Sequence, residues 1–177
     1  MKQRWALVLL GAWLMGSICM SIVATENFYT VDRLLAGSPG NATFSALTQK
    51  LGQPAGRDLL RYLSSELNRL YFQMWNVAQI LIGIAVLSLT KGAPKQDPAY
   101  ARGTRWGVIA MLATVVLMLG YLAPAIVSLG RALDFVPRDP APPGMSRFWV
   151  LHAAYTSLEM LKLCVGLLVA WRVVKTS

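Results

Sequence analysis

Four long apolar runs constrain this chain more than any other feature of its sequence. They cover residues 5–24, 70–90, 106–130 and 148–171. A helix rises about 1.5 Å per residue, so a run of roughly 20 residues crosses a hydrocarbon core about 30 Å thick. Backbone polar groups in lipid have no water to bond, so each run is expected to be helical. We therefore predict an all-α integral membrane protein, a four-transmembrane-helix bundle.

The overall composition agrees with this fold class. The chain has 177 residues, of which 55% are hydrophobic and 14% charged, whereas a soluble domain carries about 25% charged residues. A net charge of +9 could indicate nucleic acid. The apolar excess instead favours basic residues that set membrane topology, so we expect lipid and no nucleic acid as partner. Cys19 and Cys164 both lie in apolar runs and indicate no disulfide framework.

The first run is expected to be a retained span. Lys2 and Arg4 precede it, as in a signal peptide. Its apolar stretch is too long for a typical signal sequence, and no A-x-A cleavage site ends it.

Basic residues predict the orientation. They gather before the first run, between the second and third, and after the fourth: Lys2, Arg4, Lys91, Lys95, Arg102, Arg105, Arg172 and Lys175, with Asp97 as the one acid. The positive-inside rule then places both termini in the cytoplasm, with the chain in an inner or plasma membrane. Five of the six Trp residues also lie at span ends, as in aromatic belts.

The outer connection, residues 25–69, is expected to be helical. Asn41 can cap a short helix that ends at Lys50, and residues 53–56 (Gln-Pro-Ala-Gly) should break it. From Arg57 on, leucines recur at helical spacing. This predicts an extra-cytoplasmic amphipathic helix that runs into the second span and lies on the outer bilayer surface or caps the bundle. Residues 131–147 form a stiff, Pro-rich outer loop, and the whole chain is one membrane domain.

Ionisable groups inside a membrane are costly, so they are candidate functional residues. The fourth span carries a polar stripe at helical spacing: His152, Tyr155, Thr156, Glu159 and Lys162. Glu159 lies about 16 Å into the span. Lys162 is three residues further on, so the two side chains can pair.

The second span offers partners for this stripe. Gln73, Asn76 and Gln79 are spaced three residues apart, and Gln79 lies about 14 Å deep from the same side. The two spans are therefore predicted to face each other through these groups. Ser17 and Ser21 permit close approach of the first span, and Pro124 should loosen or kink the third.

Three interpretations of the stripe remain open. It can be a satisfied polar core that fixes which helices pack together. It can be a path for protons, ions or small solutes through Glu159 and His152. It can also hold a cofactor, with His152 as ligand to a haem or chlorophyll-type pigment, although no cofactor is the default expectation.

Short stretches resemble a known membrane-protein family. They are residues 147–152 (Arg-Phe-Trp-Val-Leu-His), 157–159 (Ser-Leu-Glu), 121–126 (Tyr-Leu-Ala-Pro-Ala-Ile), 13–16 and Phe28. The chain resembles the uncharacterised family that includes transmembrane protein 205. It departs from that family at Ala24-Thr25, where an Ala-Pro pair is frequent. The resemblance implies a four-helix membrane domain and no established reaction.

The first prediction for function is a non-enzymatic structural or accessory subunit of a membrane assembly or homo-oligomer. Short loops and the lack of a nucleophile–base pair or metal-ligand spacing favour it. The alternative is a small proton-coupled or ion/solute transporter that uses Glu159, Lys162 and His152. The third is a pigment- or haem-binding subunit with His152 as ligand.

Overall fold

The computed structural model describes residues 2–37, 40–90 and 98–175, with the side chains of residues 98–100 left out. Every regular element in these residues is helical. The elements are α1 (Lys2–Leu35), α2 (Ala42–Leu51), α3 (Gln53–Leu89), α4 (Pro98–Leu117), a π-helical segment η1 (Met118–Leu122), α5 (Ala123–Ala132) and α6 (Met145–Lys175). The all-α prediction is confirmed.

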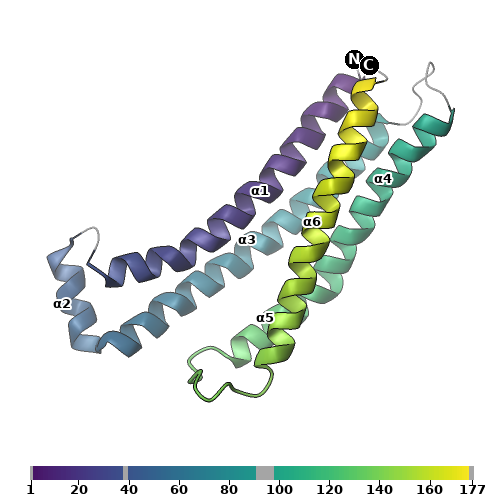
Figure 1. Ribbon diagram of the computed structural model, residues 1–177. Helices are drawn as coiled ribbons and strands as arrows, with labels where there is room; N and C mark the ends of the chain where they lie inside the picture. Colours follow the sequence, from purple (N-terminus) through teal and green to yellow (C-terminus); the bar gives the residue numbers. More distant parts are fainter. Residues whose placement is uncertain (1, 38–39, 91–97, 176–177) are drawn as a thin grey trace.

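The long helices form an elongated bundle with both ends of the chain at one end (Figure 1). There α1, α3, α4 and α6 run side by side. At the other end α1 and α3 continue past the neighbouring helices, and α2 joins them. We call this extension, residues 25–69, the arm.

The arm differs from the predicted outer connection in two ways. The first helix does not end near Ala24 but runs on to Leu35. In addition, residues 53–69 continue along α1 and away from the other helices, instead of capping the bundle (Figure 1). At about 1.5 Å per residue, α1 with 34 residues and α3 with 37 residues both exceed the length that a hydrocarbon core requires.

The turn between α2 and α3 lies in the predicted region, but the helix is broken at Gly52 and not at residues 53–56. Asn41 caps α2 as expected, since its side chain accepts a hydrogen bond from the Phe44 amide at 2.9 Å. The chain turns at Gly52, whose φ of +80° suits glycine. Pro54 lies in the first turn of α3, where a missing amide hydrogen costs nothing, so it starts a helix.

Pro124 has the predicted effect on the third apolar helix. The π-helical segment η1 lies just before it, and the Ala123 amide bonds to the Met118 carbonyl, five residues back. Proline has no N–H to donate, so it interrupts the regular ladder and favours such an irregular turn. The helix nevertheless continues to Ala132.

Within the described part of the chain, three helices are long and apolar enough to cross a membrane: Lys2–Leu35, Gln53–Leu89 and Ala101–Ala132. The last helix, α6, has 31 residues but is not among them, and its apolar sequence is interrupted by His152, Glu159 and Lys162. The structure therefore supports a membrane protein with three candidate spans.

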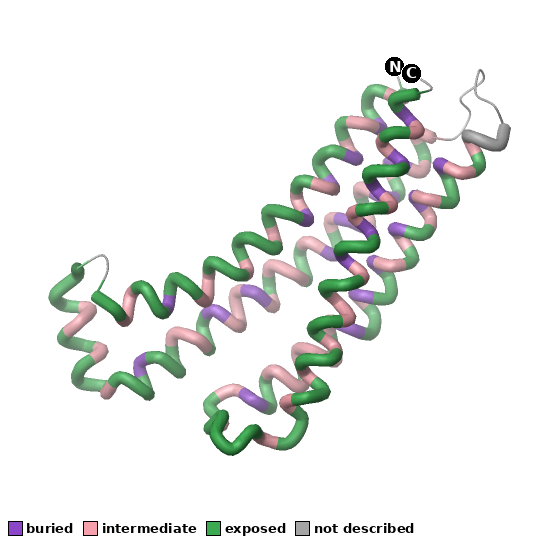
Figure 2. The backbone as a smooth tube through the Cα atoms, in the orientation of Figure 1, coloured by how far each residue is buried: buried purple, intermediate pink, exposed green. Residues whose placement is uncertain are grey.

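The bundle has a narrow apolar core and an apolar exterior. The core cluster consists of Leu10, Trp13, Val86, Val108, Met111, Val115, Val169 and Val173. Buried residues follow the faces where the helices meet (Figure 2). Large apolar side chains such as Leu81, Val150 and Leu167 are more than half exposed. A bundle that presents such side chains outward suits an apolar solvent.

Candidate functional site

A buried polar network joins α1, α3 and α6 in the middle of the bundle. Its centre is Gln79 on α3, which is fully buried. The Gln79 carbonyl oxygen accepts a hydrogen bond from Trp13 Nε1 on α1 at 2.8 Å. The same oxygen accepts a second one from Lys162 Nζ on α6. One side-chain amide therefore connects three helices.

The donors and acceptors around them determine the orientation of the side-chain amides of Gln79 and Asn76 on α3. Trp13 and Lys162 can only donate, so the Gln79 oxygen must face them. This directs Gln79 Nε2 to Asn76, whose Oδ1 accepts it at 3.2 Å. The Tyr155 hydroxyl donates to the same Oδ1 at 3.2 Å. The network thus has one consistent set of donors and acceptors.

An ion pair completes the network within α6. Lys162 Nζ lies 2.6 Å from Glu159 Oε1, and the side chains are 0% and 11% exposed. Opposite charges at this separation offset much of the cost of removing each from water. The pair is therefore close to neutral as a unit, inside an otherwise apolar helix.

Two buried polar atoms of the network have no hydrogen-bond partner among the described residues. They are Asn76 Nδ2 and Glu159 Oε2. One is a donor and the other an acceptor. Asn76 already accepts two hydrogen bonds through Oδ1, and Glu159 accepts one through Oε1. Buried polar atoms without a partner are rare in proteins. They usually bond to an internal water or a ligand, or they mark local strain.

Five of the eight predicted network residues come together, and three do not. Asn76, Gln79, Tyr155, Glu159 and Lys162 are in the network. Gln73 is exposed, because steps of three residues drift by about 60° each around a helix. Its position therefore lies well away from that of Gln79.

The other two residues, His152 and Thr156, are exposed on α6. The Thr156 hydroxyl donates to the backbone carbonyl of His152 at 3.0 Å, which satisfies it within its own helix. The His152 ring stacks on Phe148, with centroids 6.0 Å apart. Neither side chain reaches the network, so a path from Glu159 through His152 is not formed here.

Trp13 is the network residue that sequence reasoning missed, and it is fully buried. Ser17, which was predicted only to permit close approach of the first span, is also buried, and outside the network its Oγ accepts a hydrogen bond from Trp75 Nε1 at 3.4 Å. A signal for Trp13 existed, because it is the one tryptophan of six that lies away from a span end. An indole N–H buried in mid-span requires an acceptor, and Gln79 provides it.

A second polar junction holds the arm together. Asn68 on α3 donates to the Ala24 carbonyl at 2.9 Å and accepts from Asn27 Nδ2 at 2.6 Å. Ser64 donates to the Asn27 carbonyl at 3.3 Å. These contacts, together with the buried side chain of Val31, keep α1 and α3 paired beyond the bundle.

A third polar cluster links the arm to α5 and the following loop. Arg69 lies 2.5 Å from Glu66 and 2.9 Å from Asp134, and Arg131 Nη2 lies 3.2 Å from Glu66. The hydrogen bond from the Arg131 guanidinium, more than any other contact, holds the pKa of the Glu66 carboxyl below its usual value of 4.5. Glu66 lies in the arm, outside the predicted spans.

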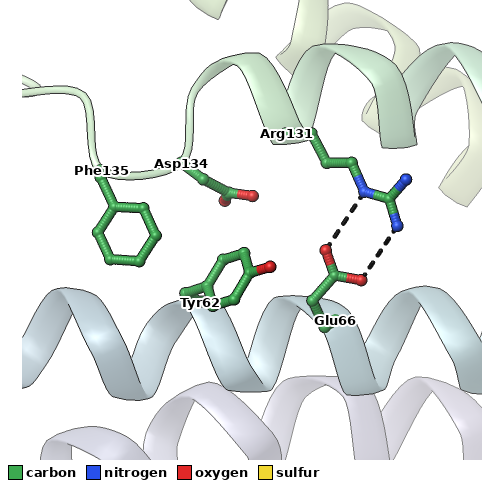
Figure 3. Close-up of a pocket in the computed structure, with 5 residues that line it drawn as sticks. All are labelled: Tyr62, Glu66, Arg131, Asp134 and Phe135. Atoms are coloured by element: carbon green, nitrogen blue, oxygen red, sulfur yellow. Dashed lines mark hydrogen bonds and ion pairs between the residues drawn. The ribbon is translucent and has the colours of Figure 1, made fainter.

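An open groove of about 410 Å³ lies at this cluster. It is lined by Tyr62, Glu66, Arg131, Asp134 and Phe135 (Figure 3). Tyr62 and Phe135 form one wall, with ring centroids 5.1 Å apart. Phe135 has a φ of +60°, which is rare for an aromatic residue.

Metal chemistry receives no support from the described residues, where no three His, Cys, Asp or Glu side chains form a group that could hold an ion. The prediction of a pigment or haem at His152 stays a prediction.

Comparisons with known proteins add no identity to this geometry. No family model, no curated protein and no solved structure matches the chain. Membership of the family that includes transmembrane protein 205 therefore stays a prediction.

Proposed function

We propose that this chain is a non-enzymatic, four-span integral membrane protein that acts as a structural or accessory subunit of a membrane assembly or homo-oligomer. The observation that carries the proposal is the buried network. Its polar groups bond mainly to one another across α1, α3 and α6. Such a network specifies which helices pack together.

The fourth span is α6. Its 31 residues extend about 46 Å at the helical rise, enough to cross. The charges that interrupt it are paired inside the bundle, so lipid does not have to solvate them. Four spans are consistent with two chain ends at the same end of the bundle (Figure 1).

The proposed orientation places that end in the cytoplasm of an inner or plasma membrane. It carries the described basic residues Lys2, Arg4, Arg102, Arg105, Arg172 and Lys175. Lys91, Lys95 and Asp97, which also entered the prediction of topology, lie outside the described residues. By the positive-inside rule the arm is then extra-cytoplasmic.

The arm supports an accessory role. It extends past the predicted membrane boundary and presents exposed apolar side chains, including Tyr29, Leu59 and Leu63. Water does not favour such groups, whereas a partner subunit can cover them.

Topology and assembly are tested together. In a variant with Cys19 and Cys164 replaced by Ala, a single cysteine is placed at Thr43 or at Lys175, both exposed positions. A membrane-impermeant maleimide on intact cells should label Thr43→Cys and not Lys175→Cys. Cross-linking in native membranes should give a species larger than the monomer. Label at Lys175→Cys overturns the topology, and a monomer alone overturns the subunit role.

A second candidate function is proton-coupled or ion transport. It is favoured by the two buried atoms without partners, Asn76 Nδ2 and Glu159 Oε2, because such groups can bind a mobile water or ion. Vesicles with the purified protein and an internal pH-sensitive dye test this. Flux that is lost in Glu159→Gln but kept in Gln73→Leu favours transport. The subunit proposal expects no flux from either protein or from the unchanged chain.

A further inference from the structure

The groove at the junction of the arm and α5 combines charged and aromatic side chains. Two carboxylates, a guanidinium and two aromatic rings share one open surface (Figure 3). The charges of this lining are paired, Glu66 with Arg69 and Arg131, and Asp134 with Arg69. Unlike the buried network, the groove is open, and Arg131 and Phe135 are 62% and 59% exposed. The groove therefore offers a ligand charges of both signs beside an aromatic surface.

Arg131 retains donors for an oxyanion. Its side chain is 62% exposed. Nε and Nη2 bond to the Glu66 carboxylate at 3.3 and 3.2 Å, which are long for a charged pair. Figure 3 shows the other terminal nitrogen directed away from Glu66. The guanidinium N–H groups that Glu66 does not use can donate to a phosphate without displacing the existing contact.

The opposite wall suits an alkylammonium group. Phe135 is 59% exposed beside Tyr62. The carboxylate of Asp134, which is paired with Arg69 and 14% exposed, lies next to the two rings (Figure 3). Aromatic faces attract quaternary ammonium ions, and a neighbouring carboxylate adds to the attraction. The left-handed backbone of Phe135 is costly, and residues held this way cluster at ligand sites.

The groove also lies at the right depth for a lipid headgroup. Glu66 precedes the start of the second span, Leu70, by four residues, which is about 6 Å along the helix. The headgroup layer occupies this depth on each side of the hydrocarbon core. This step rests on the membrane placement given under the proposed function.

We propose that the groove binds the headgroup of a zwitterionic phospholipid. The headgroup phosphate lies against Arg131. Its ammonium group lies against the rings of Tyr62 and Phe135, close to the Asp134 carboxylate. A headgroup with no ammonium, such as phosphoglycerol, lacks the second half of this interaction.

Lipid retention by the purified full-length protein tests the proposal. The protein in a non-ionic detergent is mixed with equal amounts of phosphatidylcholine and phosphatidylglycerol, and native mass spectrometry counts the lipids that stay bound. We expect phosphatidylcholine to be retained at least about threefold over phosphatidylglycerol, in line with one cation–π contact. Equal retention overturns the proposal.

Two variants locate the binding in the groove. Phe135→Gly removes the ring, and Arg131→Gln removes the charge; each should lower phosphatidylcholine retention about 3- to 10-fold. Glycine adopts a positive φ freely, so Phe135→Gly should melt close to the unchanged protein. The matched controls are Tyr29→Leu and Arg33→Gln, because both residues are similarly exposed on the arm. Controls that lose as much lipid as the groove variants overturn the assignment.

Two further arms separate the possible failures. An excess of soluble phosphocholine should displace little lipid, and full displacement overturns a lipid as the occupant. Resistance of the protein to alkaline carbonate extraction reports membrane insertion independently of the groove. Extraction by carbonate contradicts the proposed function, whereas insertion without lipid preference contradicts only the headgroup site.

Discussion

At the scale of single residues, the side-chain amide of Gln79 has the largest structural role. It is the shared acceptor for the Trp13 indole N–H and for Lys162, whose ammonium group also donates to Glu159. Its amide nitrogen also orients Asn76, which in turn holds Tyr155. Loss of one side chain therefore affects contacts on three helices.

Gln79→Leu tests this role. The change leaves Trp13 Nε1 without its acceptor and Lys162 with Glu159 alone, so we expect a loss of about 2–4 kcal/mol in the free energy of unfolding. Thermal unfolding in detergent, followed by tryptophan fluorescence, measures it. Gln73→Leu is the matched control, because Gln73 is exposed on the same helix and should change stability by less than about 0.5 kcal/mol. Equal effects of the two changes would contradict the central role of Gln79.

The ion pair of α6 allows a second prediction at this scale. Glu159→Gln should destabilise the protein by about 3–5 kcal/mol, because it leaves the Lys162 charge buried without its counter-charge. The double change Glu159→Leu with Lys162→Met removes both charges and should recover most of the loss, since apolar groups can replace a buried pair. The same unfolding measurement serves. If the double variant were no more stable than Glu159→Gln, the pair would contribute to the free energy of unfolding through more than the cancellation of the two charges.

At the scale of elements, close helix contact depends on glycines that face large side chains. Gly83 on α3 is the clearest case. A Cβ there would lie 2.4 Å from a Leu112 methyl carbon and 2.8 Å from the Trp13 ring. The indole of Trp13 thus lies against Gly83 while its N–H bonds to Gln79, one turn away. Sequence and packing together place α1 against α3.

Gly83→Ala should weaken this contact. The ring of Trp13 cannot shift without losing its bond to Gln79, so we expect a cost of about 1–3 kcal/mol from overpacking. Gly11→Ala on α1 is the control, because a Cβ there meets no atom within 4 Å. That change should be neutral or stabilising by up to about 1 kcal/mol through helix propensity. Thermal unfolding measures both variants. A loss of stability in Gly83→Ala alone supports close packing at Gly83, whereas an equal loss in Gly11→Ala would mean that these helices do not tolerate alanine for glycine in general.

The helices themselves could be predicted from the sequence, but their ends could not. Apolar runs of membrane length define α1, α3 and α4 with α5, because only helices satisfy the backbone in lipid. The extension of α1 from Ala24 to Leu35 depends instead on contacts with α3, such as Asn27 with Asn68. Those partners are 41 residues apart in the chain, and local patterns do not reveal such pairs.

The polar site shows the same division. Depth along each span correctly paired Gln79 with the stripe on α6, because rise per residue is fixed. Facing direction was less secure: the three-residue spacing included Gln73, which the helical drift turns outward. His152 lies on the stripe by spacing, yet its ring packs on Phe148 of its own helix. Which helix stands opposite a given residue is a property of the whole bundle.

At the scale of the whole molecule, the arm and the bundle are connected by charges. Arg69 and Glu66 of α3, together with Arg131 and Asp134 at the end of α5, form an alternating cluster across the junction. The apolar core does not extend this far. The position of the arm relative to α5 therefore depends on electrostatics, and so on pH.

Acid should loosen this connection. The bond from Arg131 lowers the pKa of Glu66 in the folded protein, so the ionised carboxylate favours the folded state at pH values above its ordinary pKa of 4.5. This contribution is lost as the pH falls below 4.5 and through the lower folded pKa. Hydrogen exchange of residues 57–69 should accordingly be slow at pH 7 and, after correction for the intrinsic rate, less protected below pH 4.5.

Two variants identify the group responsible. Glu66→Gln cannot ionise, so it should show reduced protection already at pH 7 and a smaller further change with acid. Glu26→Gln removes a carboxylate that is paired with Arg33 inside α1 alone, so the acid response should remain. If Glu66→Gln kept the full acid response, the cluster would not be what holds the arm to α5. The contact between the rings of Tyr62 and Phe135, which carries no charge, would then be what joins the arm to the segment after α5.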